Sequence, residues 1–357
     1  MRALVAMSGG VDSSVAAALT LRAGHDVIGV TLKQWVGPDG EMPTAGCCTV
    51  ADAEDARRVA AQLEVPYYVL DYVDEFTSAV VEPFAADYLA GRTPNPCIEC
   101  NRKVRFSALF ERMDALGADV LVTGHHARIR GDEEGWHLLR AVDGTKDQSY
   151  VLHMLGQDEL ASIRLPVGEM TKVEVRRLAS SMGLRTASKP DSQDICFVKS
   201  DYRAFLDSVL PEAPQPGDVV TVDGTVVGAH AGTSRFTIGQ RKGLGVAVGE
   251  PRYVIDIRPA TAEVVIGSYE ELLVDACLVS QVTFVAGEPP PRSHVDVKVR
   301  YRSKPVPATL QAAEGDRWKV VFSEAGPAPA PGQSAVFYDG EEVLGGGVID
   351  EVLRTNV

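Results

Sequence analysis

Short apolar runs alternate with segments of helical period along the first 207 residues. The apolar runs predict strands, and they span 3–7, 27–32, 67–70 and 120–123. Residues 11–23 and 50–63 lie between them and have a helical pattern; in "VADAEDARRVAAQL" the Ala, Val and Leu residues share one face. Strands that alternate with helices predict an α/β fold, a parallel sheet with helices on both faces. Ligands of such sheets bind at the carboxyl ends of the strands.

The pattern changes after the first 207 residues. Proline-rich stretches, "PEAPQPGDVV" and "GEPPPR", precede segments of short, glycine-punctuated alternation. In "HVDVKVRYRS" the alternation puts Val295, Val297, Val299 and Tyr301 on one face of a strand, and Asp296, Lys298, Arg300 and Arg302 on the other. We therefore expect an α/β domain over 1–207 and two small antiparallel, barrel-like β-domains over 208–280 and 281–357.

Composition narrows the class of protein. Of the 357 residues, 45% are hydrophobic and 24% charged, which is typical of a soluble globular protein with more than one core. No apolar run approaches the ~18 residues that span a bilayer, and a strand follows Met1-Arg2 directly, so we expect a cytoplasmic protein without signal peptide or membrane contact. The net charge of −14 argues against a protein that coats nucleic acid nonspecifically, but local basic surfaces such as Arg235, Arg241 and Lys242 remain.

The stretch "SGGVDSS", residues 8–14, connects the first predicted strand to the first helix. Gly9 and Gly10 let the backbone approach a ligand, and the helix start offers N–H groups to an anion. An ordinary strand-to-helix turn is the alternative, which adjacent glycines flanked by serines disfavour. The loop lacks the lysine of a Walker motif, which argues against γ-phosphate transfer. Asp12 instead fits Mg²⁺, which neutralises pyrophosphate while AMP is transferred.

The cysteines carry the second chemical signal. Cys97 and Cys100 form a C-x-x-C pair beside Arg102, Lys103 and Arg105, which bias a thiol toward thiolate. Structural zinc is one alternative, but a second ligand pair is missing; buried inert thiols are another. Cys196 lies in the polar stretch "SQDICF". Together with an adenylating loop, the cysteines suggest sulfur transfer: a persulfide attacks an adenylated carbonyl, and a second cysteine takes up the disulfide. Cys47, Cys48 and Cys277 are expected to be core or loop thiols.

Six motifs occur in an order that resembles a known family: "MSGGVDSS", "PNPCIECNRKVRF", "TGHHAR", "KDQSYVL", "SQDICFV" and "RFTIGQRKGLG". The loop resembles the pyrophosphate loop of N-type ATP pyrophosphatases, and the whole chain looks like the bacterial tRNA-specific 2-thiouridylases. The resemblance implies an ATP pyrophosphatase domain followed by two β-domains. It also implies that ATP adenylates O2 of the wobble uridine in the anticodon arm of tRNA, and that sulfur from a donor or relay protein replaces it.

The resemblance also implies roles for individual residues. Cys100 matches the first catalytic cysteine and Cys196 the persulfide-bearing one. The residues implied to bind ATP are Ala6, Met7, Ser8, Gly9, Gly10, Val11, Asp12, Ser13, Leu32 and Gly124. Those implied to lie against the target base or to contact tRNA are Asn95, Pro96, Cys97, His125, Lys146, Asp147, Gln148, Arg300, Tyr301 and Gln333. For Tyr301 the alternation favours a core position instead. Vicinal histidines on a strand point opposite ways, so we expect at most one of His125 and His126 to face the ligand.

One departure from the family opens an alternative. Many members carry Asp where this chain has Cys97, so Cys97, Cys100 and Cys196 together would supply three thiolates to a [4Fe–4S] cluster. We rank this below the persulfide route. Two other functions compete. An adenylating synthetase of the same fold, such as a tRNA lysidine synthetase, needs no cysteine pair, and a nucleotide sensor binds ATP without turnover.

Overall fold

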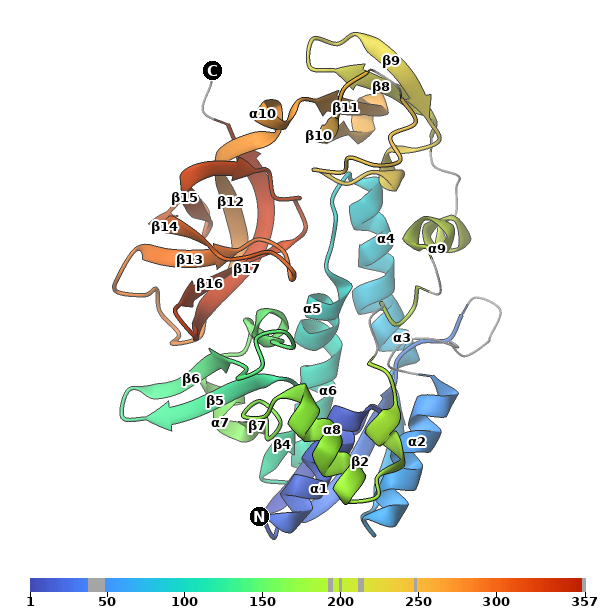
Figure 1. The fold of residues 1–357 in the computed structure, drawn as a ribbon, viewed down its shortest axis with the longest axis vertical. Helices are drawn as coiled ribbons and strands as arrows, with labels where there is room; N and C mark the ends of the chain where they lie inside the picture. The colour runs from blue at the N-terminus through green and yellow to red at the C-terminus, as the bar shows by residue number, and fades with distance from the viewer. Residues whose placement is uncertain (38–48, 192–194, 199–200, 211–214, 247–248, 355–357) are drawn as a thin grey trace.

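A computed structural model describes residues 1–37, 49–191, 195–198, 201–210, 215–246 and 249–354. Cys47 and Cys48, for which we expected core or loop positions, lie outside these ranges. The strands form three sheets, which we call the N-terminal, central and C-terminal sheets (Figure 1). None of the helices within the described ranges is long and apolar enough to cross a bilayer.

The N-terminal sheet is parallel throughout, with the strand order β3-β2-β1-β4-β7. Its strands are β1 (Arg2–Ala6), β2 (Asp26–Lys33), β3 (Tyr67–Asp71), β4 (Val120–Val122) and β7 (Ile163–Arg164). The sequence pattern predicted the first four of these. Ala3 and Val5 point to one face of β1, where they pack against α1 (Val11–Arg22), α2 (Val50–Gln62) and α8 (Lys172–Ser181). The predicted helices and the parallel sheet are therefore confirmed.

Leu4 points to the opposite face, which a second group of helices covers. These are α3 (Val73–Phe76), a π-helical turn (Thr77–Val81), α4 (Glu82–Leu89), α5 (Pro96–Cys100), a second π-helical turn (Asn101–Arg105) and α6 (Phe106–Ala115). Figure 1 shows α4 reaching from this face toward the central sheet, with α5 beside the C-terminal sheet. The position of α5 matters because this helix contains Cys97 and Cys100.

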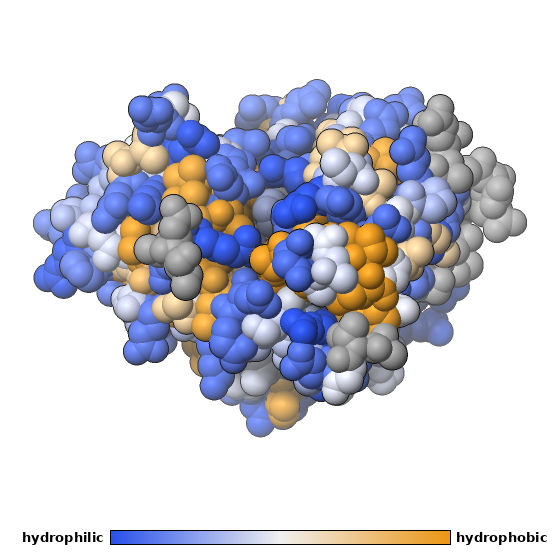
Figure 2. Space-filling model, turned by 90° about the horizontal axis from the view of Figure 1, so that it is seen from above, coloured by the Kyte–Doolittle hydropathy of each residue, from blue (hydrophilic) through white to orange (hydrophobic). Residues whose placement is uncertain are grey.

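The central sheet has the order β10-β11-β8-β9. Its strands are β8 (Gly217–Thr221), β9 (Val226–His230), β10 (Tyr253–Arg258) and β11 (Glu263–Gly267), and α9 (Tyr202–Val209) precedes them. β8 and β11 pair in parallel, whereas the other pairs are antiparallel as expected. Seen from above, this end of the molecule shows hydrophobic patches between hydrophilic residues (Figure 2). Val222, Val226 and Tyr269 are among its exposed apolar residues.

The C-terminal sheet closes on itself because β12 pairs with both β15 and β17. β12 crosses the expected division between residues 280 and 281, and it pairs within this sheet on both sides of that point. The strands are β12 (Leu273–Phe284), β13 (His294–Lys298), β14 (Val306–Ala312), β15 (Trp318–Pro327), β16 (Ser334–Asp339) and β17 (Glu342–Leu353). A barrel-like β-domain after the α/β domain is thus confirmed.

Two strands from the N-terminal half extend this sheet. The hairpin β5 (Ala127–Asp132) and β6 (Gly135–Arg140) follows β4, and β6 pairs with β17 at Leu138–Val343 and Leu139–Glu342. Short helices complete the fold: η3 (Ser149–Leu152), α7 (Gln157–Ser162), η4 (Arg185–Ser188), η5 (Thr233–Arg235), η6 (Pro259–Thr261) and α10 (Tyr269–Leu272).

One strand is shorter than its alternation predicted. Val295 and Val297 of β13 are buried as expected, but the strand ends at Lys298. Residues 300–303 form a turn in which the Ser303 N–H donates to the carbonyl of Arg300. The expectation that Arg300 and Tyr301 lie on opposite faces of one strand is therefore wrong, since side chains in a turn do not follow the two-residue period.

Candidate functional site

The loop after β1 is shaped for close approach to an anion. Gly9 has φ +71°, and a Cβ atom there would lie 2.1 Å from the carbonyl oxygen of Asp52, so only glycine fits. The Ser8 N–H donates to Ser13 Oγ over 3.1 Å, which braces the loop. α1 begins at Val11, and the first N–H groups of a helix have no partner within it. The predicted residues Ala6 to Ser13 thus form one continuous strand–loop–helix unit.

Gly124 and Leu32 bring two further strands to this loop. Gly124 is the second residue after β4, and a Cβ atom there would lie 2.5 Å from the backbone N of Ser13. Leu32 is a buried residue near the carboxyl end of β2. The residues implied to bind ATP therefore gather where β1, β2 and β4 end, which is the edge expected for a ligand of a parallel sheet.

Asp12, in the first turn of α1, is surrounded by groups that the sequence did not indicate. Lys172 Nζ lies 2.6 Å and 2.9 Å from its two carboxylate oxygens, and His126 Nε2 lies 3.0 Å from one of them. Burial raises the pKa of Asp12, but the hydrogen bonds with His126 and Lys172 outweigh it and hold the pKa below its ordinary value. His126 thus faces the loop, and His125, which we expected to contact tRNA, lies against Thr123.

Asp191 is the second carboxylate of this cluster. It accepts hydrogen bonds from Lys146 Nζ at 2.8 Å and Arg176 Nη2 at 2.7 Å, and it forms an ion pair with Lys172 Nζ at 2.8 Å. Burial raises the pKa of Asp191, but the hydrogen bonds and charges of Lys146 and Lys172 outweigh this effect and lower the pKa to about 2. Sequence analysis missed Lys172 and Asp191 because they lie far along the chain from the loop and carry no motif of their own.

Cys97 and Cys100 lie at opposite ends of α5. Asn95 caps this helix, its Oδ1 accepting from the N–H groups of Cys97 and Ile98, and Pro96 occupies its first turn. Cys97 is exposed, whereas Cys100 is buried, with Gln34 Nε2 3.2 Å from its sulfur. The basic residues that we expected to act on these thiols make other contacts as well: Lys103 pairs with Glu99 at 3.0 Å, and Arg102 donates to Gln281 at 2.8 Å.

Cys196 is half-buried, and its neighbour Phe197 anchors this part of the chain. The Phe197 ring lies 5.7 Å from that of Phe76 and 5.2 Å from that of Phe84, measured between centroids. Cys100 is part of the same hydrophobic core, and Cys196 packs against it. The fold thus brings the two predicted catalytic cysteines to one core, although they are 96 positions apart in the sequence.

The residues after β4 and β6 that we expected to contact tRNA form hydrogen bonds within and between these two loops. His125 Nδ1 lies 2.8 Å from Thr123 Oγ1. Asp147 Oδ1 accepts from the Ala141 and Ser149 N–H groups, and Gln148 Oε1 accepts from the His126 N–H at 2.9 Å. These side chains therefore have structural partners near Asp12 and Asp191, whatever else they bind.

The predicted tRNA contacts of the C-terminal part reach the same region. The Tyr301 hydroxyl donates to the carbonyl of Asp147 over 3.2 Å. Gln333 Nε2 donates to the carbonyl of Thr93 over 2.7 Å, two positions before Asn95. Arg300 Nη2 donates to the carbonyl of Ile238 in the central part of the chain. The structure thus places Gln333 beside the segment that leads to α5, and Tyr301 beside the loop that contains Asp147.

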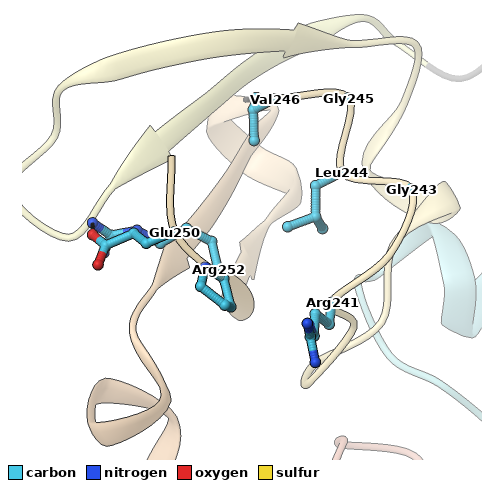
Figure 3. Close-up of a pocket in the computed structure, with 8 residues that line it drawn as sticks. Arg241, Gly243, Leu244, Gly245, Val246, Glu250 and Arg252 are labelled. Carbon is cyan, nitrogen blue, oxygen red and sulfur yellow. Dashed lines mark hydrogen bonds and ion pairs between the residues drawn. The ribbon is translucent and has the colours of Figure 1, made fainter. Parts of the chain in front are cut away.

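The basic stretch of the central part forms a separate feature. A pocket of about 370 Å³ is lined by Arg241, Gly243, Leu244, Gly245, Val246, Glu250, Pro251 and Arg252. Figure 3 shows Arg241 and Leu244 on one side of this pocket and the ion-paired Glu250 and Arg252 on the other. Arg235 of the same stretch pairs with Asp207 at 2.7 Å. This pocket includes none of the residues of the loop, of α5 or of the Cys196 segment.

Comparison with known proteins covers the chain from end to end. Three family models match: a tRNA methyl transferase HUP domain over residues 1–200, a tRNA methyl transferase PRC-barrel domain over 203–268 and an aminomethyltransferase beta-barrel domain over 274–349. The chain is 48% identical to the tRNA-specific 2-thiouridylase MnmA of Carboxydothermus hydrogenoformans, over 99% of this chain and 98% of the relative. It is 42% identical to the protein of that name from Clostridium botulinum, over 99% and 98%.

A solved structure, a 4-thiouridine synthetase–RNA complex with bound ATP, is similar at 18% identity with a TM-score of 0.35. That similarity covers 55% of this chain and 44% of the other, and it is too low to support an argument. The descriptions of the family models name a methyl transferase, whereas the full-length relatives are named 2-thiouridylases. The relatives carry more weight, because their identity extends over the whole chain.

Proposed function

Because this chain belongs to the tRNA-specific 2-thiouridylase family, we propose that it uses ATP to replace O2 of a tRNA uridine, the wobble uridine of the anticodon arm, by sulfur. One observation carries the chemistry: the phosphate-type loop follows β1, and Gln34, which contacts Cys100, follows the neighbouring strand β2. The predicted nucleotide site and a predicted catalytic thiol therefore lie at the same edge of the sheet.

ATP binds across the ends of β1, β2 and β4 in this proposal. The backbone from Ala6 to Ser13 contacts the phosphates at the α1 N-terminus, and Leu32 and Gly124 lie near the nucleotide. O2 of the uridine attacks the α-phosphorus, pyrophosphate leaves, and the uridine carries AMP on O2. The uridine must first leave its stack, and Asn95, Pro96 and Cys97 at the start of α5 are proposed to lie against it.

Sulfur then arrives from a persulfide on Cys196. The terminal sulfur attacks C2, and AMP leaves with the former O2. The Cys100 thiolate attacks the sulfur of Cys196, the sulfur–sulfur bond of the persulfide breaks, and 2-thiouridine is released with a Cys100–Cys196 disulfide. Reduction and a separate sulfur-donor protein must restore the persulfide before the next turnover. Cys100 lies in the large hydrophobic core that includes Phe76 and Phe84, and Cys196 packs against the same core.

The residues at Asp12 do not form a protein-held Mg²⁺ site. Both carboxylate oxygens contact Lys172, and within the described ranges no group of three His, Cys, Asp or Glu residues is placed to hold a metal ion. Mg²⁺ at Asp12 stays a prediction. Cys97, Cys100 and Cys196 likewise do not form such a group, so the described geometry does not fit a [4Fe–4S] cluster on these three thiolates.

The test is thiolation of tRNA by purified Cys100→Ala and Cys196→Ala variants, supplied with ATP and a persulfide donor and read by nucleoside analysis. Cys277→Ala is the matched control, because Cys277 is fully buried in the C-terminal sheet, where burial raises its pKa to about 12. We expect loss of 2-thiouridine in the first two variants only. Full activity in either would reject the proposal, and tRNA-stimulated pyrophosphate release that needs neither cysteine would indicate another adenylating synthetase.

A further inference from the structure

The phosphate-type loop has no lysine of its own, yet a lysine from elsewhere in the chain reaches it. Lys172 lies 160 positions after Asp12, and its ammonium contacts both oxygens of that carboxylate. The side chain of Lys172 is only 10% exposed. A buried ammonium is costly unless it is paired, so the fold has a cation fixed beside the first turn of α1.

The backbone around Lys172 keeps this cation in place. Lys172 is the first residue of α8, and Thr171 caps the helix: Thr171 Oγ1 accepts from the Glu174 N–H, while Glu174 Oε2 accepts from the Thr171 N–H at 2.8 Å. The Lys172 N–H donates to Asp143 Oδ2 over 3.0 Å. The backbone from which the long side chain extends is thus held by the helix cap and by Asp143.

Two carboxylates share the one ammonium. Asp12 contacts Lys172 from the α1 side, and Asp191 contacts it from the segment that leads toward Cys196. Asp191 also forms ion pairs with Lys146 and Arg176. Its charge therefore stays paired when Lys172 gives up this contact to bind a phosphate. An anionic phosphate at the start of α1 would be repelled by Asp12 alone. With Lys172 present, the charge of the carboxylate is neutralised, and the ammonium next to the phosphate position can exchange one of its three carboxylate contacts for a phosphate oxygen.

We propose that Lys172 is a phosphate-binding residue for ATP, supplying from α8 the lysine that the loop lacks, and that Asp191 is the positioning residue that holds its ammonium there. The proposal rests on the nucleotide site proposed above. It answers why the loop contains an aspartate: Asp12 pairs with a lysine that enters from outside the motif.

The test measures binding of ATP and, separately, of adenosine to the full chain by isothermal titration calorimetry without tRNA. We expect Lys172→Ala to raise the Kd for ATP at least about tenfold, whereas the Kd for adenosine, which has no phosphate, stays the same. Lys172→Arg should restore part of the ATP affinity because it keeps the charge. Arg258→Ala is the control, since it removes an exposed ion pair with Asp256 in the central sheet.

Asp191→Asn tests the positioning role, and it should weaken ATP binding less than Lys172→Ala does. Equal ATP affinity in the unchanged chain and in Lys172→Ala would overturn the proposal, and so would equal weakening of ATP and adenosine, which indicates a structural role. The proposed function fails separately. If the chain never thiolates tRNA but its ATP affinity depends on Lys172, only the thiolation is wrong; if it thiolates and Lys172→Ala binds ATP normally, only the role of Lys172 is wrong.

Discussion

At Gly124 a single methyl group has no room. A Cβ atom there would lie 2.5 Å from the Ser13 nitrogen and 2.7 Å from the Asp12 carbonyl carbon, both backbone atoms of the first turn of α1. We expect Gly124→Ala to lower the free energy of unfolding by about 2 kcal/mol, because backbone must move to admit the methyl. It should also weaken ATP binding, since the movement displaces the loop. Urea unfolding and calorimetry measure the two effects.

Gly144→Ala is the matched control. A Cβ atom at Gly144 meets nothing within 4 Å, so the change should alter stability by less than about 0.5 kcal/mol. Equal losses of stability in the two variants would contradict the close packing at Gly124.

The sequence alone predicted some of the individual site residues. The glycines and serines of the loop and the cysteine pair stand out because neighbouring letters form a motif. Lys172 does not, because its role depends on packing that brings it to Asp12 from 160 positions away. His126 belongs to the "TGHHAR" motif, but its contact with Asp12, 114 positions away, also depends on packing. A lone lysine after a threonine looks like any capped helix start until the fold places its ammonium.

At the scale of elements, the N-terminal cap of α8 should affect nucleotide binding as well as stability. Thr171→Ala removes the side chain that accepts from the Glu174 N–H, which costs about 1 kcal/mol of unfolding free energy. Because Lys172 follows directly, fraying of this turn should also raise the KM for ATP. Thr171→Ser keeps the hydroxyl and should restore both. A loss of stability with unchanged KM would show that the cap does not position Lys172.

The elements themselves were predictable where their pattern is local. The four predicted strands of the parallel sheet were found because they are short apolar runs, and the helices α1 and α2 because their sequences follow a helical period. The pairing of β6 with β17 was not predictable, since nothing in "GWHLLR" specifies a partner some 200 positions away. The end of β13 at Lys298 was missed because the alternation continues into a turn.

At the scale of the whole molecule, several contacts join the N-terminal half to the C-terminal sheet. They include the β6–β17 pairing, Tyr301 with Asp147, and Gln333 with Thr93. The contact of Gln333 with Thr93 lies beside the residues that we propose for the target base, because Thr93 is two positions before Asn95. The C-terminal sheet therefore packs beside the segment that leads to α5. A variant that separates the C-terminal sheet from the N-terminal half should lose tRNA thiolation, while the parallel sheet still binds ATP.

A further contact between the two halves, that of His137 with Glu342, makes the attachment of the β5–β6 hairpin to β17 dependent on pH. His137 of β6 lies between two carboxylates, with Nδ1 2.6 Å from Glu342 of β17 and Nε2 3.0 Å from Asp132 of β5. The hydrogen bond with Glu342 raises the pKa of His137, burial opposes it, and Asp132 raises it further, so the net shift is upward. A protonated imidazole donates to both carboxylates, whereas a neutral one donates to only one.

A raised pKa in the folded state means that this contribution to stability is fully present below the unfolded pKa of 6.5 and is lost as pH rises through the higher folded value. We expect His137→Gln to lower the Tm more at about pH 6 than at about pH 9, where the unchanged chain has itself lost the proton. Thermal unfolding of both proteins at the two pH values measures this difference. The same gap in Tm at both values would mean that the imidazole holds the hairpin as a neutral group, and that its proton plays no part in joining the two halves of the molecule.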